Sequence, residues 1–159
     1  MFHKIKVLQC IRQGLIGGGE SHLLSLMENL DHSRFEPVLL SFTEGPMIER
    51  LKKMNIKTYV IATKKPFNFT KWNAVKKLIQ KENIELVHAH GTRAFSNTFW
   101  AAKSLRLPVI YTVHGWSFHQ DQPYLIRKIR ILGEEYLTAK ADINISVSVS
   151  NQHSGKKFI

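Results

Sequence analysis

The stretch that decides the fold is residues 5–30, IKVLQCIRQGLIGGGESHLLSLMENL. It begins with IKVLQCI, an almost wholly apolar run, which predicts a β-strand buried on both faces. Three glycines, Gly17, Gly18 and Gly19, follow, and after them leucines and a methionine recur at helical spacing. A buried strand that leads through a glycine loop into a helix is typical of an α/β protein.

The same alternation continues along the chain. Apolar runs rich in valine and isoleucine recur at residues 36–42, 57–63, 84–90, 108–114 and 142–148. Amphipathic helices are predicted between them, at 22–30, 46–54, 70–83, 96–105 and 123–141, with a last helix from near Ser150. Thr70 and Ser96 are the expected N-caps of two of these helices. The pattern predicts an α/β fold with a Rossmann-like, doubly wound parallel sheet of six or seven strands, in the order 3-2-1-4-5-6, with helices on both faces.

The longest predicted helix has an apolar side and a basic side. The apolar side comprises Leu125, Ile126, Ile129, Leu132, Tyr136 and Leu137. Arginines and lysines of the segment RKIR, residues 127–130, occupy the rest. This distribution predicts an ordinary amphipathic helix packed on the sheet, and a basic membrane-surface role is the alternative.

Length and cysteine content restrict the class of protein. The 159 residues fit one domain, 1–159, and 43% of them are apolar, enough for a hydrophobic core. Cys10 is the only cysteine, which excludes an intrachain disulfide and fits a reducing compartment, where we expect this thiol to be buried and inert. The sequence lacks an apolar run of about 20 residues and a signal-peptide h-region, so we expect a cytoplasmic protein.

The net charge of +11 indicates either an anionic partner or a solubility surface. Nucleic acid, an acidic membrane surface and phosphorylated ligands are the anionic partners to weigh. The basic residues are spread over the chain, and only RKIR forms a local cluster.

The glycine loop fails both familiar phosphate-binding fingerprints. In the dinucleotide pattern G-x-G-x-x-G, counted from Gly17 and Gly19, His22 stands where the third glycine belongs. A Walker loop needs lysine and then serine or threonine after its last glycine, and Glu20 and Ser21 stand there. Loop amides at a helix N-terminus still favour an anion, so a phosphate contact and a ligand-free turn both remain open.

Ligands of open parallel sheets bind beyond the carboxyl ends of the strands. The predicted strand 84–90 ends at His90, and Gly91 and Arg93 follow it in the segment HAHGTRAF. The next strand ends at His114, and Gly115 follows in TVHGW. A histidine at such an edge can hydrogen-bond a substrate hydroxyl or accept a proton, so both histidines are expected in a site.

A metal site is conceivable from His88, His90, His114 and His119. No cysteine and no carboxylate apart from Asp121 lies among them, so we expect no metal. By strand alternation His88 faces the same side as His90, and we expect it to be a satisfied core histidine.

Taken in order, these pieces resemble the N-terminal domain of the GT-B glycosyltransferases, specifically the retaining family 4. The segments that carry the resemblance are GGGESHLLSLMENL, FEPVLLSFTEGPMIERLKKMNIKTYVI, IELVHAHGTRA, LPVIYTVHGW and ADINISVSVSN, which span nearly the whole chain. The resemblance implies two Rossmann-like lobes with the active site between them. The N-terminal lobe holds the glycan or lipid-linked acceptor, and the C-terminal lobe mainly holds the nucleotide-sugar donor.

The resemblance also implies roles for individual residues. His114 matches the family's active-site histidine, which contacts the transferred sugar. The loop residues Gly17, Gly18, Gly19 and Glu20 match the segment that approaches the donor diphosphate and the acceptor. His90, Gly91 and Arg93 match the loop that borders the acceptor, and Gly115 is a further expected substrate-binding residue. The family uses neither a cofactor nor a metal bound by an Asp-x-Asp motif, and no such motif occurs here.

One departure from the family is large. The donor-side Glu-x7-Glu motif of the C-terminal lobe is absent, and Glu134 and Glu135 do not replace it. We therefore expect this chain alone to fold but not to catalyse transfer. Because the resemblance implies glycan or lipid-linked acceptors, we expect the positive charge to serve peripheral contact with an anionic membrane surface.

Two other classes compete with the transferase. A nicotinamide-dependent Rossmann oxidoreductase is suggested by the glycine loop and by Glu44, an acid near the end of the second strand, but the fingerprint fails. A nucleic-acid-binding module is suggested by the charge, but FNFTKW at 67–72 is the only stretch with interleaved aromatic and basic residues. We expect no nucleic-acid partner.

Overall fold

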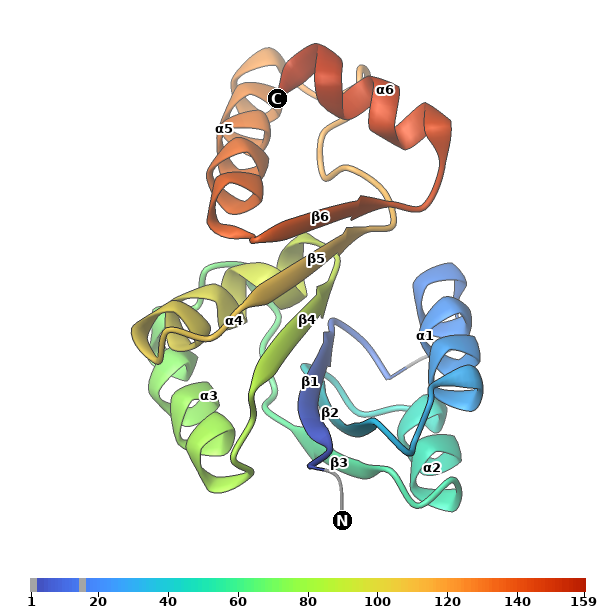
Figure 1. Ribbon diagram of the computed structural model, residues 1–159. Helices are drawn as coiled ribbons and strands as arrows, with labels where there is room; N and C mark the ends of the chain where they lie inside the picture. The colour runs from blue at the N-terminus through green and yellow to red at the C-terminus, as the bar shows by residue number, and fades with distance from the viewer. Residues whose placement is uncertain (1–2, 15–16) are drawn as a thin grey trace.

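The computed structural model describes residues 3–14 and 17–159. Within them lies one parallel sheet with the strand order β3-β2-β1-β4-β5-β6, which confirms the predicted doubly wound topology (Figure 1). The strands are β1 Ile5–Ile11, β2 Phe35–Ser41, β3 Lys57–Val60, β4 Leu86–His90, β5 Val109–Val113 and β6 Ile143–Ser146. The helices are α1 Gly18–Asn29, α2 Pro46–Lys53, α3 Phe69–Lys81, α4 Thr92–Ser104, α5 Tyr124–Lys140 and α6 Val149–Phe158.

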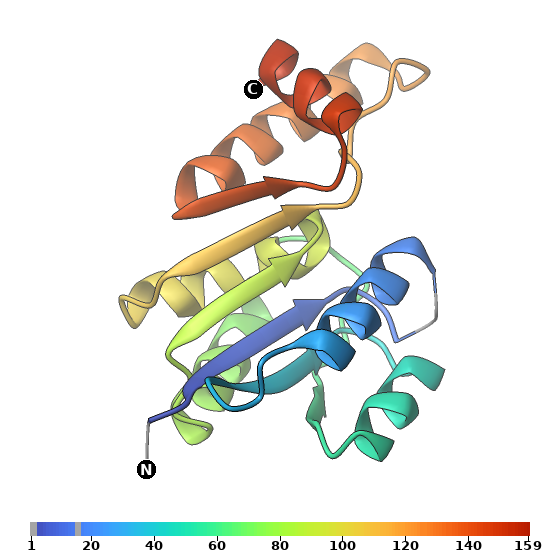
Figure 2. The same ribbon diagram turned by 45° about the vertical axis from the view of Figure 1, so that its right-hand side comes forward.

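The sheet separates two hydrophobic clusters. On one face, side chains of α1 and α2 such as Leu23 and Leu51 pack with Leu39 of the sheet. Helices α3 and α4 lie on the other face (Figure 2). They contribute the larger cluster, which includes Ile79 and Phe95. Burial on both faces explains why the central strands are apolar almost throughout rather than alternating.

Cys10 of β1 is fully buried, and burial raises the pKa of its thiol. The prediction of a buried, inert thiol is therefore confirmed. Among the helices described, none is both long and apolar enough to cross a bilayer.

Three helices begin earlier than predicted. Helix α4 starts at Thr92 instead of Ser96, because Gly91 has a φ of 79° and lets the chain turn directly from strand to helix. The N-cap of α3 is Asn68, and the Thr70 hydroxyl donates to its Oδ1, so neither Thr70 nor Ser96 is an N-cap. Helix α1 starts at Gly18, four residues before the predicted start.

The prediction that the apolar side of α5 packs on the sheet is wrong for five of its six residues. Only Leu137 is buried, whereas Leu125 is 67% exposed and Ile129 is 60% exposed. The physical reason is position, because α5 lies at the edge of the sheet where β6 is the last strand (Figure 1). Its described contact with the rest of the domain is mainly through α4, where the ring of Tyr136 meets that of Phe99 edge to face.

Candidate functional site

His90 and His114 meet at the carboxyl edge of the sheet. His90 is the last residue of β4, and His114 follows the end of β5, the neighbouring parallel strand. Their imidazoles lie in hydrogen-bond contact, with His90 Nδ1 3.1 Å from His114 Nε2. The sequence placed each of these histidines at the end of a strand, and the structure shows that the two are in contact.

Hydrogen bonds determine which nitrogen of each ring carries the proton. His90 Nε2 donates to Gln9 Oε1 on β1, at 2.9 Å. A neutral imidazole that donates from Nε2 accepts at Nδ1, so His114 donates to His90 from its own Nε2. The Nδ1 atom of His114 then remains an acceptor, available to a substrate hydroxyl.

Both imidazoles are neutral near pH 7. Burial, followed by the charges of neighbouring histidines, holds the pKa of His90 well below the usual histidine value. Burial and the nearby His22 also lower the pKa of His114, which is partly exposed. The pair is therefore suited to hydrogen bonding and proton acceptance rather than to holding a positive charge.

His88 is a satisfied core histidine, as predicted. Its Nε2 lies 2.8 Å from Thr112 Oγ1, and its ring centre lies 4.2 Å from that of His90, on the same face of the sheet. Burial lowers the pKa of His88 to about 4. Its ring packs against that of His90, and it lies two residues before the end of β4.

The glycine segment lies against His114. Gly17 is the N-cap of α1, and Gly18 and Gly19 form its first turn. A Cβ on Gly19 would lie 3.4 Å from Cγ of His114, so this glycine lets the helix approach the imidazole closely. Leu15 and Ile16 of the predicted loop lie outside the described residues.

Glu20 is buried in the first turn of α1, where a carboxylate suits the positive end of the helix dipole. A Cβ built on Gly17 would lie 2.9 Å from its Oε2. The absence of a side chain at Gly17 thus makes room for the Glu20 carboxylate.

His22 joins the site although the sequence analysis did not include it. One nitrogen each of His22, His90 and His114 lies within 4.8 Å of the other two, an arrangement that could hold a metal ion. Of the four histidines that the sequence suggested as a conceivable metal set, His90 and His114 belong to this group, whereas His88 and His119 do not. Helical periodicity could have identified it, because His22 lies three residues after Gly19 on the same face of α1.

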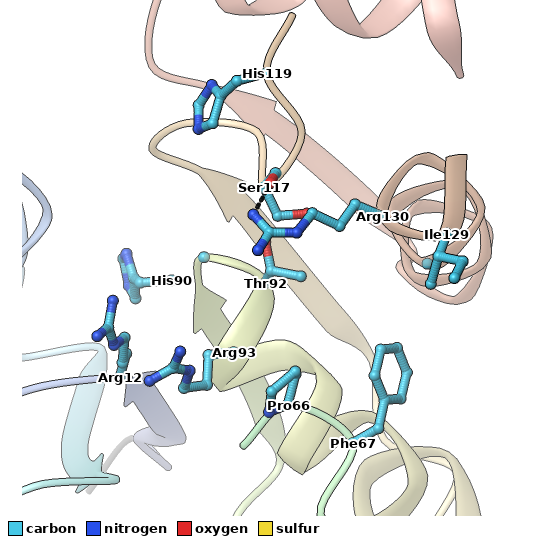
Figure 3. A pocket seen from close by; sticks show the side chains of 12 residues that line it. Arg12, Pro66, Phe67, His90, Thr92, Arg93, Ser117, His119, Ile129 and Arg130 are labelled. Atoms are coloured by element: carbon cyan, nitrogen blue, oxygen red, sulfur yellow. Dashed lines mark hydrogen bonds between the residues drawn. The ribbon is translucent and has the colours of Figure 1, made fainter. Parts of the chain in front are cut away.

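A second part of the site is a cavity of about 530 Å³ beside His90 (Figure 3). Gly91 and Arg93, both predicted, line it. Its other lining residues are Arg12, Pro66, Phe67, Thr92, Ser117, His119, Ile129, Arg130 and Gly133. Arg12 follows the end of β1 and carried no local motif, and Arg130 of the RKIR segment in α5 gave no sign that it would lie near it, because the two are far apart in the sequence.

Gly115 does not reach this cavity. It lines a smaller neighbouring hollow together with Trp116 and Asn151, and the Trp116 Nε1 donates to the backbone oxygen of Asn151 at 2.7 Å. The predicted residues thus fall into three groups. His90 and His114 lie with the glycine turn, and Gly91 and Arg93 line the arginine cavity, which His90 also lines. Gly115 lies apart, in the smaller hollow.

Solved structures share this fold. Anabaena HepE, solved with UDP-glucose, is 19% identical over 96% of this chain, with a TM-score of 0.76. MurG of Acinetobacter baumannii is 16% identical over 92%, with a TM-score of 0.65. A Listeria monocytogenes protein assigned as a UDP-N-acetylglucosamine 2-epimerase is 17% identical over 98%, with a TM-score of 0.63. This chain spans 40%, 42% and 42% of these three chains, respectively.

At such low identity these likenesses show the fold alone. The comparison with curated protein sequences found no match. The family is shown by sequence, since a family model described as Glycosyltransferase Family 4 matches residues 16–154, which contain both histidine strand ends and the glycine turn. The chain therefore belongs to glycosyltransferase family 4.

Proposed function

We propose that this chain is the acceptor-side lobe of a retaining glycosyltransferase, which moves a sugar from a nucleotide-sugar donor to a glycan or lipid-linked acceptor. The observation that carries the proposal is the arrangement of His114, held between the ring of His90 and the backbone of Gly19 at the carboxyl edge. Membership of family 4 supports the chemistry, and the UDP-glucose bound to HepE supports the class of donor.

Each group at the edge has a role in this proposal. His114 accepts a hydrogen bond at Nδ1 from a hydroxyl of the transferred sugar, because its Nε2 proton is committed to His90. The free amides at the start of α1 face the donor diphosphate, to which the positive end of the helix is complementary. A second lobe supplies most of the donor contacts, so these groups alone bind the diphosphate weakly. The acceptor occupies the cavity that Gly91 and Arg93 line.

The reaction proposed needs neither a cofactor nor a metal ion. The leaving diphosphate is stabilised by backbone amides and by cationic side chains, which act where charge develops. His90 and His114 then act as a hydrogen-bonded pair, and His22 packs beside them.

The test is His114→Ala in the enzyme that combines this chain with its donor-side lobe. We expect the rate of sugar transfer from UDP-glucose or a related donor to fall about 100-fold, the usual cost of removing an active-site hydrogen-bonding group. His153→Ala, an exposed histidine on α6, is the matched control and keeps the rate. Transfer at the wild-type rate by His114→Ala would overturn the proposal.

The same assay separates this function from its rivals. Conversion of a UDP-sugar to its epimer without any acceptor would favour an epimerase, which the fold also allows. Saturable binding of NADH would favour an oxidoreductase, and a strongly salt-dependent DNA or RNA shift would favour a nucleic-acid module. Robust transfer by the 159-residue chain alone would contradict the two-lobe arrangement.

We further propose that the protein contacts anionic membranes peripherally, from the cytoplasmic side, through α5. Tyr124 is 78% exposed and Leu125 is 67% exposed, and Arg127 and Lys128 lie beside them. An exposed apolar face flanked by basic side chains matches an anionic lipid surface.

Flotation with phosphatidylglycerol vesicles tests this contact. The double variant Tyr124→Ser, Leu125→Ser should lose binding, whereas Ile5→Ser, at the amino end of β1, should retain it. Equal flotation with neutral phosphatidylcholine vesicles would contradict the preference for anionic lipid, and no loss in the double variant would contradict contact through α5.

A further inference from the structure

The cavity beside His90 gathers three guanidinium groups with no carboxylate partner among the residues described. Arg12 follows the end of β1, Arg93 lies in the first turn of α4, and Arg130 comes from α5 (Figure 3). None of the three forms an ion pair within the described part of the chain. Among the described residues, the one hydrogen bond that these three side chains make runs from Arg130 Nη1 to the backbone oxygen of Ser117, at 2.6 Å.

Arg12 and Arg93 repel each other. Burial, together with the charge of Arg12, lowers the pKa of Arg93, which means that the folded protein disfavours its positive charge. Two guanidinium groups held together without an acid leave an unbalanced positive potential in a partly enclosed space. An anion bound between them would remove that repulsion and accept bidentate hydrogen bonds.

The N-terminus of helix α4 adds to the positive potential of the cavity. Gly91 is its N-cap and offers no side-chain cap, so the first amides of α4 are not capped by a side chain at the edge of the cavity. The first turn contains no acidic residue. The partial positive charge of a helix N-terminus therefore points to the same space as Arg93.

Part of the cavity lining is apolar. Pro66, Phe67 and Ile129 form it, and Ile129 is 60% exposed. A ligand that fits both the arginines and the apolar lining has a strongly anionic group joined to an apolar or weakly polar body. His90 belongs to this cavity and also contacts His114, so the anionic group would lie next to the proposed reaction centre.

We propose that this cavity is a subsite for a phosphoryl group of the acceptor, held by Arg12, Arg93 and Arg130. The inference rests on the proposed function and specifies its acceptor class. A phosphoryl group suits three guanidinium groups better than a carboxylate does, because it carries a charge of about −1.5 to −2 near neutral pH and presents three acceptor oxygens. The phosphoryl group comes either from a lipid phosphate or from a free sugar phosphate.

Calorimetric titration with inorganic phosphate, dodecyl phosphate below its micelle concentration, and glucose 6-phosphate tests the subsite. We expect Arg93→Gln to weaken binding of all three probes at least about tenfold, which corresponds to the loss of a charge-assisted hydrogen bond. Arg93→Lys should recover part of the affinity, because lysine keeps the charge but not the bidentate geometry. Arg34→Gln, which removes an exposed arginine that precedes β2, is the matched control.

The probes distinguish the two sources of the phosphoryl group. Tighter binding of dodecyl phosphate assigns the subsite to a lipid-linked acceptor, and tighter binding of glucose 6-phosphate assigns it to a sugar phosphate. Wild-type affinity in Arg93→Gln, or binding of glucuronate in preference to all phosphates, would overturn the proposal.

The variant His114→Ala distinguishes failure of the phosphoryl subsite from failure of the proposed transferase function. It should bind phosphate normally while losing sugar transfer. If transfer depends on His114 but no probe binds the wild-type protein, the subsite is wrong and the transferase proposal stands.

Discussion

The carboxylate of Glu134, fully buried in α5, accepts a hydrogen bond from the hydroxyl of Thr92, the first residue of α4, at 2.6 Å. The same carboxylate accepts from the Tyr111 hydroxyl at 3.0 Å and from the Ser117 amide at 3.1 Å. One side chain therefore ties together β5, the start of α4, the loop after β5, and α5. Three of these, the start of α4, the loop after β5 and α5, line part of the arginine cavity, so Glu134 positions that part of the rim without lining it.

Replacing Glu134 by alanine should destabilise the domain. The change leaves the donors of Thr92, Tyr111 and Ser117 without their partner, and each unsatisfied buried group costs about 1–3 kcal/mol. We expect the free energy of unfolding, measured by urea titration, to fall by about 3 kcal/mol or more. Glu135→Ala, at the exposed neighbouring position, is the control and should change it by less than about 0.5 kcal/mol. Equal stability of the two variants would contradict this account.

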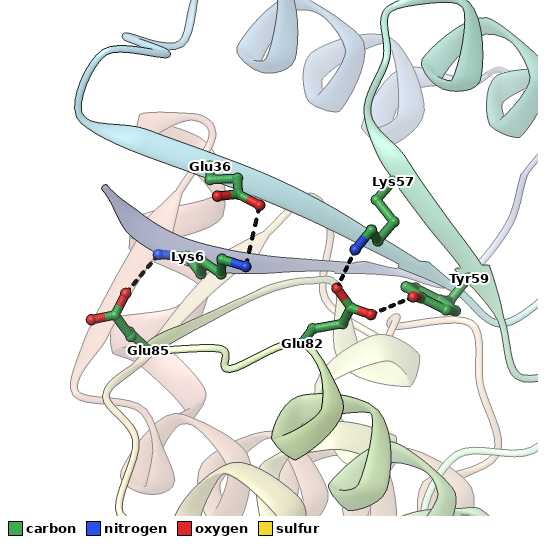
Figure 4. A network of polar contacts seen from close by, with 6 residues as sticks. All are labelled: Lys6, Glu36, Lys57, Tyr59, Glu82 and Glu85. Carbon is green, nitrogen blue, oxygen red and sulfur yellow. Dashed lines mark hydrogen bonds and ion pairs between the residues drawn. The ribbon is translucent and has the colours of Figure 1, made fainter. Parts of the chain in front are cut away.

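Glu82 should make stability depend on pH in the acid range. Lys57 Nζ donates to its carboxylate at 2.7 Å, and the Tyr59 hydroxyl donates to the other oxygen (Figure 4). These hydrogen bonds lower the pKa of Glu82 in the folded protein, and the one from Lys57 has the largest effect. A depressed folded pKa adds stability above the unfolded value of about 4.3, and this stability is lost as the pH falls through the folded pKa.

The measurement is the free energy of unfolding from pH 7 to pH 3, for the wild type and for Glu82→Gln. The wild type should be more stable at pH 7, and the difference should shrink as the pH falls below about 4.3. Glu36→Gln is the control, because its partner Lys6 lies at 3.4 Å and both side chains are partly exposed. A difference that does not change with pH would exclude this role for the Glu82 carboxylate.

Two helical glycines should respond oppositely to alanine. In α6 a Cβ on Gly155 would lie 2.5 Å from Cζ2 of Trp116, which is too close for any contact, so Gly155→Ala forces the indole to move. We expect a loss of about 1–3 kcal/mol. In α5 a Cβ on Gly133 meets nothing nearer than Phe67, at 3.9 Å, so Gly133→Ala should stabilise the helix by up to about 1 kcal/mol. Thermal unfolding of the two variants measures both, and a stabilised Gly155→Ala would contradict the close packing on Trp116.

Chelation should leave sugar transfer unchanged. The proposed chemistry uses no metal, although His22, His90 and His114 lie close enough to ligate one. We expect the two-lobed enzyme to keep its rate in excess EDTA, and His22→Ala to transfer at close to the wild-type rate. If EDTA abolished transfer, a divalent cation restored it, and His22→Ala behaved like the chelated enzyme, the histidine cluster would be a functional metal site.

The local sequence pattern was sufficient to predict the strands and part of the candidate site. Apolar runs identified the six strands that the structure describes. The signal was clearest for the central strands β1, β2, β4 and β5, because a strand buried on both faces has no polar side to obscure it. Strand ends identified His90 and His114, since parallel strands place their carboxyl ends on one edge. The family also followed from these segments and their order, and the family match confirms it.

Local pattern failed where the outcome depended on distant neighbours. Periodicity predicted a buried apolar side for α5, yet Leu125 and Ile129 are exposed, because periodicity cannot say whether a partner layer lies opposite. Helix starts were also missed, as at Gly91, where a left-handed backbone conformation allowed an immediate turn that residue type alone did not reveal.

By itself, the sequence determined the order of strands and helices, the absence of a disulfide and of the dinucleotide fingerprint, and which histidines end strands. These are properties of consecutive residues, so local chemistry dictates them. Only the tertiary structure decided that His22 joins His90 and His114, and that Arg12, Arg93 and Arg130 share a cavity. Such groupings join residues of different elements, and their distances depend on how the crossovers and helices pack.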